Sequence, residues 1–127
     1  MHEVRIRTRW TDFDALGHIT HAAYPVFLDE ARDAYLTEAV GSFEEWPWVV
    51  AHISIDYRQE LRLPTREVVV RTAVAATGRT SVTFGQQVMG PDGTCAVEAR
   101  SVVVAWDEAG RRPRELNADD AARLKRR

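Results

Sequence analysis

The spacing of apolar residues along the chain predicts one strand, one long helix and then a series of strands. Residues 4–10 alternate apolar side chains with arginines, which is the period of a strand that has one face in water. Over residues 22–40 the apolar side chains instead recur at helical spacing, and the alanines between them suit a helix pressed closely against a sheet. Pro25 fits the first turn of this helix, and Gly41 is a suitable stop signal.

Strand-like runs follow the helix, and each of them alternates apolar with polar residues or is rich in valine. These runs cover residues 49–58, 67–76, 80–89 and 94–106. The links "TGR" and "GPDG" between the last three runs have the composition of tight turns, so we expect antiparallel hairpins. Beyond Trp106 the sequence is loop-like. Asn117 is placed to cap a short final helix at 118–125, and the rest of 117–127 is expected to be a solvated tail.

This order of elements predicts an α+β fold, in which a five-stranded antiparallel sheet wraps around one long central helix. The length of 127 residues is that of one domain, residues 1–127. The helix covers only one face of the sheet, so the other face and the sheet edges are open to a second copy of the chain.

Composition narrows the class of protein without identifying it. A net charge of −2 argues against a nucleic-acid-binding protein, which would carry a positive field. No apolar run is long enough to cross a membrane, and the first residues have no apolar signal-peptide core. The one cysteine, Cys95, lies in a strand-like run and is expected to be a buried, inert thiol. A reduced, cytoplasmic compartment is the expectation that follows.

The segment between the first strand and the helix carries most of the candidate chemistry. It reads "TDFDALGHITHAAY" over residues 11–24 and contains two acids, a glycine, two histidines and a tyrosine. Asp, Gly and Thr before a helix are also common as caps and turn formers, so the composition alone does not separate a turn from an active site. The four histidines have no metal-ligand spacing with nearby acids or with Cys95, so we expect no metal site.

The pattern Asp-x-Asp-x-x-Gly-His at 12–18, followed by Ala-x-Tyr at 22–24 and "FLDEAR" at 27–32, resembles the acyl-CoA thioesterases of the hotdog fold. The similarity is greatest to the 4-hydroxybenzoyl-CoA thioesterase-like branch, including the short-chain enzymes associated with the Tol–Pal cluster. It extends through "IDYRQEL", the turn "GRTS" and the last long strand. The resemblance implies a hotdog domain that hydrolyses an acyl-CoA thioester, and a homodimer or homotetramer with active sites at the protomer interface.

The resemblance also implies roles for the residues of this segment. Asp14 corresponds to the catalytic carboxylate, and the backbone N–H of His21 to the group that polarises the thioester carbonyl. A helix start offers free N–H groups and a positive dipole end, which is the chemistry an oxyanion needs. Gly17 lets the loop fold tightly, and His18 is expected to order the loop rather than act as a base. Whether Asp14 is a general base or a nucleophile stays open.

Tyr24 and several residues outside the motif are candidates for holding the substrate. Coenzyme A carries phosphates, so arginines are expected near the pocket mouth, and it is part of the substrate rather than a cofactor. Tyr24 can serve both the core and the acyl pocket, and Asp12 is expected to bind loop backbone or a neighbouring arginine. The expected substrate-binding residues are Tyr24, Arg58, Arg79, Thr80 and Ser81, with Arg62 and Arg100 as further arginines.

Several alternatives stay open at the level of sequence. Glu30 on the helix is an alternative catalytic acid, although Asp14 already fills that role in the motif. The chain is alternatively a non-catalytic acyl-CoA-binding hotdog domain, a thioesterase acting on an acyl carrier protein, or a hotdog dehydratase or hydratase. Where many relatives read Gly-His-Val-Asn-Asn, this chain has Thr20 and His21 at the last two positions, so the acyl group is not specified.

Overall fold

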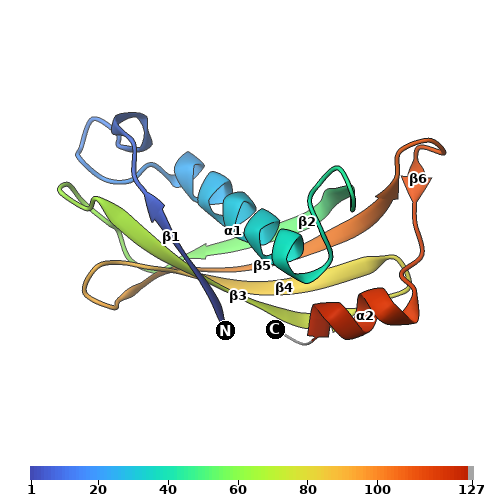
Figure 1. Cartoon of the computed structure of the whole chain (residues 1–127). Helices are drawn as coiled ribbons and strands as arrows, with labels where there is room; N and C mark the ends of the chain where they lie inside the picture. The colour runs from blue at the N-terminus through green and yellow to red at the C-terminus, as the bar shows by residue number, and fades with distance from the viewer. Residues whose placement is uncertain (126–127) are drawn as a thin grey trace.

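One long helix lies along the concave face of a curled antiparallel sheet (Figure 1). The computed structural model describes residues 1–125. In chain order the elements are β1 (His2–Arg7), the short 3-10 helices η1 (Trp10–Asp12) and η2 (His21–Ala23), α1 (Tyr24–Ala39), β2 (Trp48–Tyr57), β3 (Glu67–Thr77), β4 (Ser81–Met89), β5 (Cys95–Asp107), β6 (Arg112–Pro113) and α2 (Ala118–Lys125). The predicted α+β order of one strand, one long helix and four strands is confirmed.

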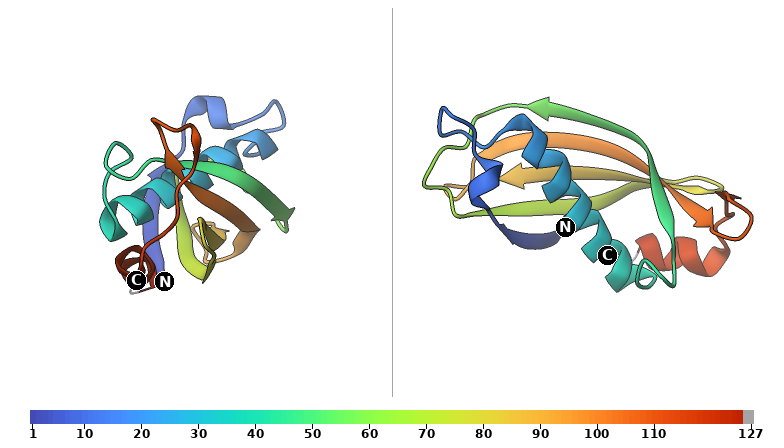
Figure 2. Two further views of the ribbon diagram at one scale, coloured as in Figure 1. Left: turned by 90° about the vertical axis from the view of Figure 1, so that its right-hand side faces the viewer. Right: turned by 90° about the horizontal axis from the view of Figure 1, so that it is seen from above.

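The strands lie in the order β1-β3-β4-β5-β2, and every pairing is antiparallel. The two predicted hairpins, β3–β4 and β4–β5, are therefore present. The sheet has one strand more than expected, because the short β6 pairs with the end of β5 in a region that the sequence indicated as loop. The end-on view shows how the sheet curls around α1 (Figure 2). Within residues 1–125, no helix is both long and apolar enough to span a bilayer.

The first strand ends three residues earlier than its alternating pattern predicts. β1 ends at Arg7, and η1 begins at Trp10, whose side chain is 84% exposed instead of covering the sheet. The backbone N–H of Arg9 donates to the carboxylate of Asp12 across this turn. The chain therefore turns into η1 and leaves the hydrogen-bond ladder between β1 and β3. The thiol of Cys95, expected to be buried, is only half-buried.

The core forms two apolar clusters, one under each half of α1. The N-terminal half of the helix packs on the ends of β3, β4 and β5 nearest to its start, and the C-terminal half packs on the opposite ends together with α2. The apolar helix positions expected from the sequence are all buried: Tyr24, Phe27, Leu28, Ala31, Tyr35 and Ala39. Burial of these side chains is the main force that holds the helix on the sheet.

A buried polar strip separates the two clusters. Arg32 is 2% exposed, and its guanidinium donates to Gln86 Oε1 (3.0 Å) and to Asp29 Oδ1 (3.3 Å). Gln86 in turn donates to the carbonyl of Leu28 on the helix (3.1 Å) and to Thr72 (3.1 Å). Burial lowers the pKa of Arg32, and Asp29 counteracts this. Because buried polar groups need specific partners, these bonds set the position of α1 along β4.

The C-terminal helix closes the far end of the core. Tyr35 donates to the carbonyl of Leu124 (2.6 Å), which ties α2 to α1. Asn117 caps α2 as predicted, because its Oδ1 accepts from the N–H of Asp120 (2.7 Å) while Asp120 accepts from the N–H of Asn117 (3.2 Å). The last two residues of the expected tail, 126–127, lie outside the described residues.

The replacement Asn117→Ala should lower the free energy of unfolding by about 1 kcal/mol, because it removes one half of this reciprocal cap. Urea unfolding followed by circular dichroism measures the change. Asn117→Asp keeps an acceptor oxygen and serves as the control, with a stability close to that of the parent chain. Equal losses in both variants would show that the cap does not stabilise α2.

Candidate active site

The loop between β1 and α1 lies at the rim of the sheet where the helix begins, at the left of Figure 1. It is fixed by backbone hydrogen bonds to the segment that links β2 to β3. Ile19 donates to the carbonyl of Leu61 (2.8 Å), and Leu63 donates to that of Gly17 (2.9 Å). The loop therefore behaves as an extension of the sheet, with a defined backbone position for each of its polar residues.

Asp12 has the structural role expected from the sequence. It is 4% exposed, and its carboxylate accepts from the backbone N–H of Arg9 (2.7 Å) and from the Arg9 guanidinium (3.2 Å). Its carbonyl accepts from the N–H of Thr20 (2.8 Å), which fastens the far side of the loop. A carboxylate that is buried and bound in this way is not free for a substrate.

Asp14 differs from Asp12 because it is exposed and only one of its oxygens is engaged. Oδ1 accepts from the N–H groups of Leu16 (2.9 Å) and His18 (3.0 Å), while the backbone N–H of Asp14 donates to the His18 carbonyl (2.8 Å). No group within residues 1–125 donates to Oδ2. Gly17 has a φ of +78°, a conformation that a side chain disfavours, so it permits this tight turn as expected. One oxygen thus holds the loop, and the other is available.

The start of the helix is also unoccupied by the protein's own side chains. Neither Thr20 before η2 nor Ala23 before α1 provides a side-chain cap. The backbone N–H groups of His21 and Ala22 have no acceptor within residues 1–125. These free donors stand at the positive end of the helix dipole, so the turn can bind an anionic or strongly polarised oxygen.

Asp14 and the helix start share one open hollow of about 360 Å³. It brings together the candidates Asp14, His18, His21, Tyr24 and Arg58, which come from the loop, from α1 and from the end of β2. The full lining is Asp14, His18, Ile19, His21, Tyr24, Tyr57, Arg58, Gln59 and Glu60. Tyr57 and Glu60 carry no signal in the sequence that links them to the motif, because only the fold brings the end of β2 beside it.

The side chains around the hollow are held by contacts across it. His18 Nε2 lies 3.0 Å from Glu60, which joins the loop to the β2–β3 link, as a loop-ordering residue would. Tyr24 is buried against Phe27 and Tyr57 in edge-to-face contacts. Burial raises the pKa of Tyr24 to about 12, with a smaller contribution from Tyr57. Its phenol therefore keeps its proton at neutral pH and is not a base.

The arginines and hydroxyls expected to bind coenzyme A do not gather at one place. Arg58 lines the hollow and pairs with Glu98 (2.9 Å). Arg79, Thr80 and Ser81 instead lie in the β3–β4 turn at the other end of the sheet, where Leu116 donates to the Arg79 carbonyl (2.8 Å). Within one chain, these three residues do not line the hollow that contains Asp14.

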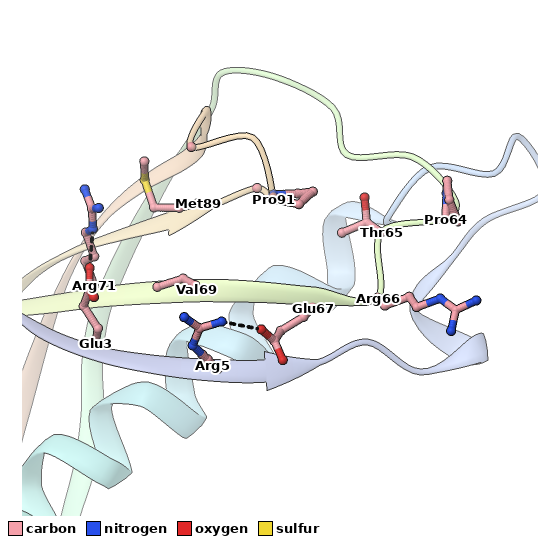
Figure 3. A pocket seen from close by; sticks show the side chains of 12 residues that line it. Glu3, Arg5, Pro64, Thr65, Arg66, Glu67, Val69, Arg71, Met89 and Pro91 are labelled. Atoms are coloured by element: carbon pink, nitrogen blue, oxygen red, sulfur yellow. Dashed lines mark hydrogen bonds and ion pairs between the residues drawn. The ribbon is translucent and has the colours of Figure 1, made fainter.

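A larger hollow, of about 670 Å³, lies elsewhere, on the outer face of β1, β3 and β4 (Figure 3). Its central charges neutralise each other, since Arg5 pairs with Glu67 (3.0 Å) and Arg71 with Glu3 (2.7 Å). It contains no residue of the motif at 11–24. Size alone therefore does not identify the functional site. Among residues 1–125, no group of three or more His, Cys, Asp or Glu side chains could hold a metal ion.

Comparison with known proteins agrees with this geometry. A profile described as "Thioesterase-like superfamily" matches residues 8–124, nearly the whole chain. The curated protein "Acyl-CoA thioester hydrolase YbgC" of Escherichia coli O6:H1 is 27% identical over 125 residues, which cover 94% of this chain and 92% of that protein.

Solved structures share the fold over nearly the whole chain. A predicted thioesterase from Bacillus stearothermophilus superposes with a TM-score of 0.87 at 25% identity, covering 96% of this chain and 92% of that one. A thioesterase from Thermus thermophilus, solved with coenzyme A and Zn, has a TM-score of 0.86 at 28% identity, covering 96% and 95% of the two chains.

The replacement Gly17→Ala should destabilise the protein by about 1–2 kcal/mol, because alanine must adopt the positive φ of this turn. Thermal unfolding measures the loss. Gly85→Ala on β4 is the matched control, since a side chain there meets no atom within 4 Å and alanine suits a strand at least as well as glycine. A variant at residue 17 as stable as the one at residue 85 would contradict the strain at this turn.

Proposed function

Because the chain belongs to the thioesterase-like superfamily, we propose that it hydrolyses acyl-CoA thioesters to a free acid and coenzyme A. The hotdog-fold resemblance of its motif is confirmed by the superfamily match and by the shared fold. Its curated relatives are named acyl-CoA thioester hydrolases, and a structural relative was solved with coenzyme A. One observation carries the proposal: the free oxygen of Asp14 and the uncapped helix start line the same hollow.

In the proposed reaction the thioester carbonyl oxygen lies at the start of the helix. The N–H of His21 donates to this oxygen, and the helix dipole stabilises the negative charge that develops on it. As a general base, Asp14 takes a proton from the water that attacks the carbonyl carbon, and the C–S bond breaks to release the thiolate. As a nucleophile, Asp14 attacks the carbon itself, the C–S bond breaks to release the coenzyme A thiolate, and water then hydrolyses the resulting mixed anhydride to the free acid and Asp14. Neither route requires a cofactor.

The nucleotide end of coenzyme A needs cations, and we propose that two copies of the chain supply them. Arg58 stands at the mouth of the hollow, whereas Arg79, Thr80 and Ser81 lie too far along the sheet to serve the same chain's Asp14. A partner subunit joined through an open sheet edge can bring its own turn to the hollow. This supports a homodimer, or a homotetramer built from two dimers, as the active assembly.

The edge strand β2 has the properties of such an interface. Within residues 1–125 it pairs with β5 alone, so its other side offers unpaired backbone groups. Several of its apolar side chains are exposed in the single chain, among them Val49, Val50 and Ile53. An edge of this kind favours pairing with a second copy rather than exposure to water.

The replacement Asp14→Asn should lower kcat for acyl-CoA hydrolysis by at least about 100-fold, because it removes the proposed base or nucleophile. Free thiol released from a panel of aliphatic and aromatic acyl-CoAs reports the rate. Glu30→Gln, which changes an exposed acid on α1, is the control and should keep its activity. If only Glu30→Gln lost activity, Glu30 on the helix would be the catalytic acid. Tight binding of acyl-CoA by the parent chain without thiol release would indicate a non-catalytic binding domain.

The replacement Ile53→Lys should convert the assembly into monomers, because it places a charge in the proposed edge-to-edge interface. Sedimentation velocity reports the mass, and thiol release should fall with it, since each hollow would lose its partner's Arg79. Ala75→Lys, at an exposed position of β3, is the control and should sediment like the parent chain. A parent chain that sediments as a fully active monomer would contradict a shared site.

A further inference from the structure

The carbonyl of His21 lies in the proposed oxyanion turn, just before the regular helix. η2 (His21–Ala23) is a 3-10 turn, in which a carbonyl accepts from the N–H three residues later, and α1 begins at Tyr24. Pro25 stands in the first turn of α1, where an N–H has no partner within the helix, so proline takes no bond from His21. A carbonyl oxygen has two lone pairs and can accept a further donor from outside the helix.

Tyr57 supplies a donor to this carbonyl. Its hydroxyl donates to the oxygen of His21 at 3.0 Å, from the last residue of β2. Its ring is held edge-on against Tyr24, with ring centroids 5.7 Å apart, and it also meets the ring of His21 at 6.5 Å. Tyr24 is itself buried, so the phenol of Tyr57 rests on a fixed support although it is exposed to the hollow.

We infer that Tyr57 is a positioning residue, which donates to the His21 carbonyl from outside the helix and holds His21 so that its own N–H faces the hollow. This inference rests on the proposed function, in which that N–H polarises the thioester carbonyl. This hydrogen bond restricts the His21–Ala22 peptide, which adjoins the Thr20–His21 peptide that carries the N–H of His21. Preorganised donors are the ones that lower a barrier. Because Tyr57 belongs to edge strand β2, pairing of that strand with a second copy would also steady the oxyanion turn.

The molecule offers a matched control for the loss of a phenol hydroxyl. Tyr35 also donates to a backbone carbonyl, that of Leu124 at 2.6 Å, but at the opposite end of the helix. Tyr35→Phe therefore removes a similar bond without touching the hollow. The two Tyr→Phe variants should both lose stability, and only the one at residue 57 should lose turnover.

The test measures kcat and KM for acyl-CoA hydrolysis in the parent chain, Tyr57→Phe and Tyr35→Phe. Tyr57→Phe should lower kcat about tenfold with KM nearly unchanged, since the N–H of His21 is then held less firmly where the oxyanion develops. Tyr35→Phe should keep the kcat of the parent chain, which separates a loss of positioning from a general loss of stability.

The possible outcomes separate this inference from the proposed function. A parent chain that releases no thiol from any acyl-CoA overturns both. Turnover in the parent with an unchanged kcat in Tyr57→Phe overturns the inference alone. An equal loss of kcat in Tyr35→Phe also overturns it, because a loss of stability would then explain both variants.

Discussion

The burial of α1 in the curled sheet is the constraint on which the other features depend. One helix supplies the apolar side chains for both core clusters, so the sheet has to curl along its whole length to cover them. Apolar packing alone would tolerate some sliding of the helix. The buried contacts of Arg32 and Gln86 between the clusters do not, because a displaced guanidinium would lose its partners in a water-free setting. The helix start is thereby placed at a defined point on the rim.

The position of the helix start also determines the path of the loop between β1 and α1. The chain must leave β1, cross the rim and enter the helix, and it does so by pairing with the β2–β3 link. The two acids of the motif have separate roles: Asp12 holds the crossing in place, and Asp14 keeps one oxygen free. The uncapped helix start is unusual for a helix in water, where a side chain normally satisfies the first N–H groups. Its free donors are most simply understood as places for a ligand oxygen.

Two features of the single chain bear on the proposed assembly. Most side chains of edge strand β2 are exposed, and the turn "GRTS" lies at the opposite end of the sheet from Asp14. The proposed pairing with a second copy would cover this edge and would bring the turn of the partner toward the hollow. Tyr57 ends the edge strand and contacts the helix start. In this proposal the site therefore depends on how the edge is covered.

The sequence by itself determined the type and order of the main elements, because apolar periodicity records which face of each element is buried. Its resemblance to a known family also indicated Asp14, Gly17 and His21 as candidates, because the motif that carries the resemblance lies within about a dozen residues. Local pairing decided what periodicity missed: Arg9 with Asp12 ended the first strand early, and β6 formed in a loop-like stretch. Only the tertiary structure decided that Tyr57 and Glu60 join the site and that Arg79 leaves it. Those distances depend on how the sheet curls around the helix, and no spacing along a chain records that.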